Sequence, residues 1–392
     1  MKHTTLLRIL PFPIPLAVAP IRAQEIAQAG TRAESAKVKS DSAAKDSTSA
    51  LAKLMMVPTI EIQHFRPSDQ RGLNMFEPPK KDAVPFTGFK LAWGTAVTQQ
   101  FQGLQHSNGA DPKIVNNVDQ NKLIGIGHGF NNAVANIYLN AQLAQGIRVA
   151  VVSYASARHH QETWVKEGYA LIDDSPIDFA PLNEIMKYTT VKVGHFEIDY
   201  GDAHYRRSDN GQALFNPFVG NYILDAFTTE IGGQVYFRTG PWLAMGGITG
   251  GEVKGMVAAP EKRSPAYLAK LGVDKSFTQN VRVRLTGSMY AQDASSSNTL
   301  FTGDRAGSRY YDVLENTAST ETAQAWSGNI RPGFANSVHS YVVNPFVKCH
   351  GLELFGNLET ATGKASTELT NRTIRQYSGE GLYRFWSDKL YL

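Results

Sequence analysis

The 392-residue sequence has little cysteine and no long apolar run, and both absences narrow the kinds of protein it can be. Its single cysteine, Cys349, excludes a disulfide framework and a cysteine-based zinc cluster, because both need several thiols. A membrane-spanning helix needs about 20 consecutive apolar residues, and the sequence contains no such run. If the chain crosses a membrane, it must therefore cross it with β-strands.

The usual signatures of catalytic, metal and nucleotide-binding sites are also missing. Neither His-Glu-x-x-His nor Gly-x-Ser-x-Gly occurs, and Gly363-Lys364 lacks the other residues of a phosphate-binding loop. His159 and His160 with Glu162 do not have metal-ligand spacing, because adjacent residues on a strand point in opposite directions. We therefore expect no catalytic residue, no cofactor and no metal, and the chain is not expected to be an enzyme.

Charge is sparse and nearly balanced. The sequence has 39 Lys and Arg against 35 Asp and Glu, a formal net charge of +4 that is too small and too evenly spread to indicate nucleic-acid binding. Charged residues make up 19% of the chain, below the roughly 25% of soluble domains. In their place there are 34 glycines and 19 Phe, 16 Tyr and 5 Trp, which suits a β-rich protein with many turns.

The first 86 residues have the composition of a leader and a linker. Residues 1–23 resemble an export signal, with Lys2 and Arg8 as the positive end, an apolar core at 9–19 and a cleavage point after Ala23. Four prolines interrupt that stretch, so a disordered cytosolic leader is the alternative. Residues 24–86 are interpreted as a low-complexity, disordered or weakly helical linker and a proline-rich periplasmic lead-in. The folded part is expected over residues 87–392.

From Phe89 onward, apolar and polar residues alternate with a period of two, which predicts strands. About twelve strands and a short stub are predicted, in the antiparallel order typical of an all-β chain. The predicted strands lie near 89–101, 134–143, 147–151, 162–172, 188–198, 228–238, 242–250, 266–274, 281–290, 338–348, 352–360 and 375–386, and the stub begins at Lys389.

The connections between these strands alternate between short and long. The short ones fall at 144–146, 239–241, 275–280, 349–351 and 387–388, with a longer exception at 173–187. The long ones fall at 102–133, 199–227, 251–265, 291–337 and 361–374. Short turns at one end and long loops at the other are typical of an outer-membrane β-barrel, whereas a soluble sandwich has no reason to sort its loops by length.

The position of the charges predicts which face of each strand meets lipid. Charged residues fall on the face opposite the apolar one, and Lys or Arg facing lipid at mid-depth would cost about 2–4 kcal/mol. The charged face must therefore line the lumen. Its basic residues are Lys90, Arg148, Lys192, Arg238, Lys270, Arg282, Arg284, Lys348 and Arg384, and its acidic residues are Glu230, Asp274, Glu353, Glu359 and Glu380. By this count the lumen is expected to be weakly basic.

The third long connection, 199–227, contains a mixed cluster of charges that could face one another across a water-filled constriction. The alternative is that these are solvated loop charges. If the loop folds inward, its arginines and those of the wall would favour anions. The predicted pore-lining or constriction residues are Arg206, Arg207, Asp202, Asp209, Lys270, Arg282, Arg284, Arg148 and Arg238.

Four segments resemble a known group of proteins. Val191 to Gly201 (VKVGHFEIDYG) resembles a strand-to-loop segment of the phosphate-selective porin O/P type family. Arg66 to Gly72 (RPSDQRG), Ser156 to Glu162 (SARHHQE) and Gly303 to Tyr310 (GDRAGSRY) resemble segments of Bacteroidota outer-membrane porin-like proteins. The resemblance covers the chain from about Ile60 to its end.

This resemblance implies a roughly 16-stranded transmembrane β-barrel in the cell outer membrane that passes small solutes. It implies outer-membrane lipid and the barrel assembly machinery as partners, and a homotrimer as the usual assembly. The chain stops a few residues into a strand, at Asp388 to Leu392, so we expect the barrel to be C-terminally incomplete in this sequence.

The leading hypothesis is an outer-membrane porin with passive diffusion of small, mainly anionic, solutes through a water-filled lumen and no chemical step. One alternative is a barrel that binds carbohydrate or a host surface through its long loops while the pore is closed. A barrel hydrolase at the external rim is a further alternative. Such an enzyme would need a nucleophile or a water-activating Asp/His group at the bases of the loops.

Overall fold

The structure is a computed structural model of the chain, which divides into two units, Met1–Pro58 and Thr59–Leu392. The described residues all lie in the second unit: 62, 65, 72, 74–77, 80, 86–156, 163–206, 224, 226–252, 263–302, 314–318, 330–386 and 390–392. The predicted export signal, most of the predicted linker, and His159, His160 and Glu162 lie outside them.

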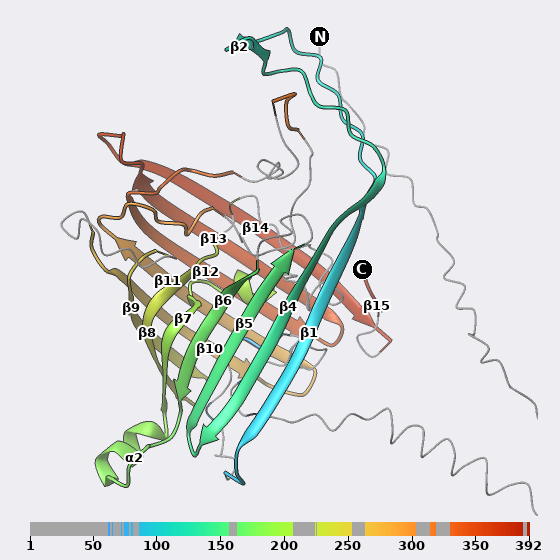
Figure 1. Cartoon of the computed structure of the whole chain (residues 1–392). Helices are drawn as coiled ribbons and strands as arrows, with labels where there is room; N and C mark the ends of the chain where they lie inside the picture. The colour runs from blue at the N-terminus through green and yellow to red at the C-terminus, as the bar shows by residue number, and fades with distance from the viewer. Residues whose placement is uncertain are drawn as a thin grey trace, which may run out of the picture. The chain divides into compact units, whose positions relative to one another are not determined.

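Within the described residues, thirteen strands form one antiparallel sheet in which each strand pairs with the next along the chain (Figure 1). The strands of this sheet are β1 (Lys90–Gln102), β4 (Gly129–Ala144), β5 (Ile147–Ser156), β6 (Thr163–Ile172), β7 (Thr189–Glu197), β8 (Thr229–Thr239), β9 (Trp242–Thr249), β10 (Ala266–Ser276), β11 (Val281–Gln292), β12 (Ser337–Cys349), β13 (Leu352–Lys364), β14 (Arg372–Phe385) and the short β15 (Leu390–Tyr391).

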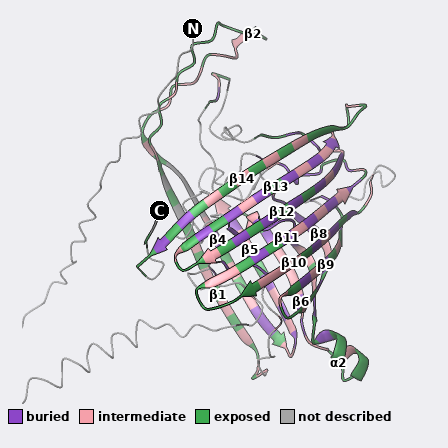
Figure 2. Cartoon of the chain, turned by 180° about the vertical axis from the view of Figure 1, so that it is seen from behind, coloured by how far each residue is buried: buried purple, intermediate pink, exposed green. Residues whose placement is uncertain are grey.

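The sheet curls around an interior, with β4 and β5 on one side and β12 and β13 on the other (Figures 1 and 2). The predicted all-β class and its twelve long strands with a stub are therefore confirmed. At its two edges, β1 pairs with β4 and β15 pairs with β14. The expectation of about 16 strands stays a prediction.

The connections are sorted by length as the sequence predicted, because consecutive antiparallel strands place every second connection at the same end of the sheet. The turns after β4, β8, β10 and β12 are short and lie at one end, here called the short-turn end. The connection after β6 also lies there and contains helix α2 (Ala180–Met186) (Figure 1). The opposite end, with the long connections, is called the long-loop end.

Three details differ from the prediction. The 361–374 connection is shorter than predicted, because β13 continues to Lys364 and β14 begins at Arg372. The connection after β1 contains a two-stranded hairpin, β2 (Ile114–Val115) with β3 (Val118–Asp119). Helix α2 was not predicted either. These elements are too short to show a period.

Burial in this sheet is the reverse of that in a soluble protein. On β10 and β11, the apolar Leu271 and Leu285 are 67% and 52% exposed, whereas the charged Lys270 and Arg284 on the other face are 0% and 2% exposed. The same alternation of buried and exposed residues runs along β11 to β14 (Figure 2). The predicted assignment of faces therefore holds: the charged face is the inner one.

Helices add little to this architecture. No helix in the described part of the chain is long and apolar enough to cross a membrane.

Candidate functional site

The most strongly charged part of the interior lies where β10 and β11 face the segment that follows β7. Lys270 points inward from β10, and its Nζ lies 2.6 Å from Asp199 Oδ1 and 2.8 Å from Asp202 Oδ1. The same Nζ donates a hydrogen bond to the carbonyl oxygen of Gly201 at 2.9 Å. A lysine that is removed from water therefore has charged and polar partners on the facing segment.

Arg284 on β11 binds the same segment through a bidentate contact with Asp202. Its Nε donates to Asp202 Oδ2 and its Nη2 to Asp202 Oδ1, each at 2.8 Å. Thr286 Oγ1 also donates to Asp202 Oδ2 at 2.8 Å. Bidentate pairing of a guanidinium with a carboxylate fixes geometry as well as supplying energy. Asp202 is therefore locked to the β11 wall.

The chain can reach this wall because it turns sharply after β7. Gly201 has a φ of +70°, in the left-handed region that favours glycine, and the short helix α3 (Ala203–Arg206) follows. Asp202 N donates to Asn344 Oδ1 on β12 at 2.8 Å. Asp202 and Arg206 are buried in the interior, so the alternative of solvated loop charges does not hold for these two residues.

A second interior segment comes from before the first strand. Glu77 Oε1 lies 2.6 Å from Lys270 Nζ, and Glu77 Oε2 lies 2.7 Å from Arg284 Nη2. Phe76 is 1% exposed, and Arg282 Nη1 donates to the carbonyl oxygen of Asn74 at 2.7 Å. Residues 74–77, predicted as part of the lead-in, are therefore inside the sheet.

A second charged group surrounds Glu353, which points inward from β13. Arg384 Nε donates to Glu353 Oε1 at 3.0 Å, and Asn74 Nδ2 donates to the same oxygen at 2.5 Å. Arg206 Nη1 lies 3.4 Å from Glu353 Oε2, and its Nε lies 3.6 Å from Glu380 Oε2. Residues 74–77 and α3 meet at this group, because Arg206 Nη1 also donates to Asn74 Oδ1 at 2.8 Å.

The other predicted residues that the structure describes lie nearer the short-turn end. Arg148 on β5 is buried and pairs with Asp173, which follows β6. Arg282 pairs with Asp274 across the β10–β11 turn, with Nε to Oδ1 at 2.7 Å. Arg238 is half-buried, with its guanidinium 4.8 Å from the centre of the Tyr236 ring. Arg207 and Asp209 lie outside the described residues.

The structure thus brings Asp202, Arg206, Lys270, Arg282 and Arg284 together and leaves Arg148 and Arg238 apart. A role of these residues in lining a pore stays a prediction. The predicted charge of the lumen counted only residues on the strands. It therefore left out acidic partners that come from outside the sheet: Glu77, Asp173, Asp199 and Asp202. The period of two in the strands does not indicate where a loop or a lead-in runs. Asp202 could be predicted only from the position of its loop along the chain.

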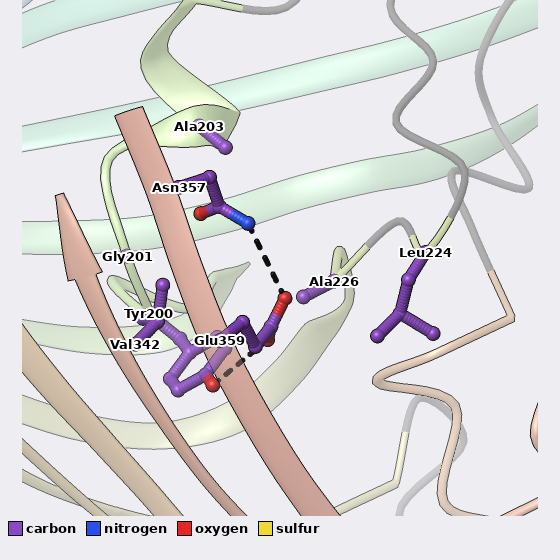
Figure 3. A pocket seen from close by; sticks show the side chains of 8 residues that line it. All are labelled: Tyr200, Gly201, Ala203, Leu224, Ala226, Val342, Asn357 and Glu359. Atoms are coloured by element: carbon purple, nitrogen blue, oxygen red, sulfur yellow. Dashed lines mark hydrogen bonds between the residues drawn. The ribbon is translucent and has the colours of Figure 1, made fainter. Parts of the chain in front are cut away.

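Towards the long-loop end, the interior is filled by apolar side chains together with buried polar ones. Tyr200, Leu300, Phe301 and Phe334 belong to one buried cluster with inward residues of β8 to β13. Figure 3 shows Tyr200, Asn357 and Glu359 around a cavity of about 10 Å³, room for about one water molecule. Tyr200 donates its hydroxyl hydrogen to Glu359 Oε1 at 2.9 Å. This part of the interior is packed.

At the long-loop end, Glu252 joins two connections, the one after β9 and the one after β11. Its Oε1 accepts hydrogen bonds from Ser295 Oγ at 2.9 Å and from Ser296 N at 3.0 Å, and Arg263 pairs with its other oxygen. Burial alone would raise the pKa of Glu252, but these hydrogen bonds and the Arg263 charge outweigh burial. The pKa of Glu252 therefore lies below its ordinary value.

Nothing in the described ranges offers a metal site, since no group of three or more His, Cys, Asp or Glu there could hold an ion. Cys349 is exposed at the end of β12 and is a free thiol.

Comparisons with known proteins find likeness in solved structures. No protein-family model and no curated protein matches the chain. In-vitro folded OmpT, an outer membrane protein of Vibrio cholerae, is similar over 77% of this chain and 73% of its own, with 9% identity and a TM-score of 0.37. OmpF of Salmonella typhi, in a complex with daunomycin, is similar over 76% and 86%, with 10% identity and a TM-score of 0.32. At these values, the assignment of function rests on the chain's own geometry.

Replacing Asp202 should be costly. Asp202→Ala removes the bidentate partner of Arg284 and one partner of Lys270, both buried, and breaking a buried ion pair costs about 3–5 kcal/mol. We expect a loss of that order in the free energy of unfolding, measured by urea titration of the protein refolded into lipid vesicles. Asp111→Ala, in an exposed loop, is the matched control and should change little. Equal stability of the two variants would contradict a structural role for this cluster.

The Glu252 contacts should weaken in acid. Because the pKa of Glu252 is lower in the folded state than in the unfolded state, its contacts stabilise the fold fully above the ordinary pKa of about 4.3. This stabilisation is lost as the pH falls through the lower pKa of the folded state. Amide hydrogen exchange at Ser296, corrected for the intrinsic rate, should show protection at pH 7 that disappears in acid. Glu252→Gln should lower the protection at pH 7 and remove the acid step, and an unchanged step in this variant would contradict the assignment.

Proposed function

We propose that the chain is an outer-membrane β-barrel through which small hydrophilic solutes diffuse passively. The reversed burial supports this proposal most directly. Outward residues such as Trp93, Leu271 and Tyr377 are exposed apolar side chains, while the charges are inside and paired. An apolar outer surface of this extent would aggregate in water, but lipid is a favourable solvent for it. In lipid, a curled sheet also keeps its backbone hydrogen bonds satisfied between strands.

The sorted connections support an orientation. In outer-membrane barrels, short turns face the periplasm and long loops face the exterior. By this rule the end with α2 and the β4–β5 turn is periplasmic, and the end with the β2–β3 hairpin and the loop of Glu252 is external. From the sequence resemblance we also propose a relation to Bacteroidota porin-like proteins and to the phosphate-selective O/P type.

The segment from Ile198 to Arg206 would be the constriction of this barrel. It lies inside the sheet, and its carboxylates share Lys270 and Arg284. Because these cations already have acidic partners, we propose at most a weak preference for anions and no dedicated phosphate site. A trimer and the barrel assembly machinery remain expectations from the resemblance.

A second candidate function is a surface-binding barrel, which would have no enzymatic activity either. The packed interior favours it, and so does an ordered external region around the β2–β3 hairpin. In that region Ile124 N donates to the Glu315 carbonyl oxygen at 3.1 Å, and Asn316 Nδ2 donates to Gln120 Oε1 at 2.7 Å. Two long connections therefore support one another, as a binding surface requires.

Ion conductance separates the two candidates. In a planar bilayer with a KCl gradient, we expect stepwise currents with a weak anion preference. Arg282→Gln should reduce that preference, because its half-buried guanidinium lies in the interior, whereas Arg372→Gln in the external region should not. A folded, heat-modifiable barrel that carries no current, both with and without residues 74–77, would contradict the channel and favour surface binding.

A further inference from the structure

We propose that Asn74–Glu77 is an internal stopper of the passage: bound inside the sheet it narrows the passage, and its withdrawal toward the short-turn end widens it. This inference rests on the proposed function, because a stopper needs a passage to close.

The segment fills the space between the inward loop and the β11–β12 wall. The Phe76 ring centre lies 5.3 Å from that of Phe346 and 5.9 Å from that of Tyr205, both edge-to-face. On the same ring lie the guanidinium groups of Arg284, at 4.3 Å, and Arg282, at 5.2 Å. Removing Phe76 would therefore leave an open space bordered by aromatic rings and two cationic groups.

The segment is joined to the sheet differently from the other interior segment. Ile198 to Arg206 lies between β7 and β8 and is held at both ends, whereas residues 74–77 precede β1 and contribute no strand. Downstream of it, Lys80 Nζ donates to the Thr189 carbonyl oxygen at 3.0 Å, at the short-turn end. Withdrawal in that direction breaks no strand pairing.

The charges also allow the segment to leave. Without Glu77, Lys270 keeps Asp199 and Asp202, and Arg284 keeps Asp202 and Asp274. A buried charge that loses its last partner is strongly destabilising, and that situation does not arise here.

The same holds at the second charged group. Without Asn74, Glu353 keeps Arg384 and Arg206. Loss of Asp202 would take a partner from the same two cations, as withdrawal of Glu77 does, and would also remove the bidentate contact with Arg284. Of the two interior segments, only residues 74–77 can leave without moving a connection between two strands, and their departure leaves Lys270, Arg284 and Glu353 paired.

Withdrawal has an electrostatic consequence. It removes one negative charge, that of Glu77, from beside Lys270 and Arg284 and opens the space next to them. The passage without the stopper should therefore be both wider and more favourable to small anions such as chloride or carboxylates.

The test compares single-channel currents of three full-length proteins: the unchanged chain, the double variant Phe76→Ala/Glu77→Gln, and a control. The control, Phe89→Ala/Glu184→Gln, makes the same chemical changes at exposed sites. We expect a severalfold larger conductance and a shift of reversal potential toward anions in the Phe76/Glu77 variant only. Glu77→Gln alone, which keeps the bulk of the segment, should give the reversal shift with a smaller gain in conductance.

A peptide supplied in trans makes the test specific. A peptide with the sequence of residues 70–80, added to the short-turn side of the double variant, should reduce its current in a concentration-dependent way. The same peptide carrying both substitutions, or the original peptide added on the long-loop side, should not. Block from either side alike would contradict a stopper that enters from the short-turn end.

The outcomes separate the two proposals. If the unchanged chain and the double variant conduct equally, the channel stands and the stopper is overturned. If neither conducts although both are folded by heat-modifiable mobility, the proposed function fails and the stopper with it. A closed unchanged chain with a conducting variant supports both.

Discussion

The pairing of buried charges is the constraint on which this structure depends. The sheet places its charged side chains inside, so each one must find an opposite charge or a hydrogen-bond partner there. Lys270 and Arg284 cannot satisfy one another, and the strands around them supply too few acids. Asp199 and Asp202 from the inward loop supply the missing acids, and Glu77 from the lead-in adds a further partner to both cations. The inward loop is therefore part of the fold and not an accessory to it.

Much of the sheet was predictable, because the face of a strand residue follows from its position in a period of two. Lys270 and Leu271 could be assigned to opposite faces from sequence alone, and the structure confirms this. The direction of a connection has no such rule. Asp202 was singled out only by the position of its loop, and Glu77, Phe76 and Asn74 were missed because a proline-rich stretch carries no period. The prediction of a weakly basic lumen counted only strand residues, so it left out these acidic partners for the same reason.

Packing and charge lead to the same view of function. An outer surface rich in exposed apolar residues requires lipid, while the interior combines an apolar cluster near the long-loop end with ion-paired groups nearer the short-turn end. A wide, water-filled lumen is not what these side chains build. Passage through the charged part of this interior depends on the inward loop and on residues 74–77, which both occupy it. The inward loop connects β7 and β8, whereas residues 74–77 can leave with Lys270, Arg284 and Glu353 still paired.

The most direct test of this account measures whether lipid, water or protein surrounds each residue along β10. Nitroxide labels placed singly at residues 267–273, in a Cys349→Ser background refolded into vesicles, report accessibility to oxygen in lipid and to a water-soluble nickel complex. The account predicts high oxygen accessibility at Tyr267 and Leu271 and low accessibility to both reagents at Leu268 and Lys270. Nickel accessibility at Tyr267 and Leu271, or the absence of a period of two, would contradict it.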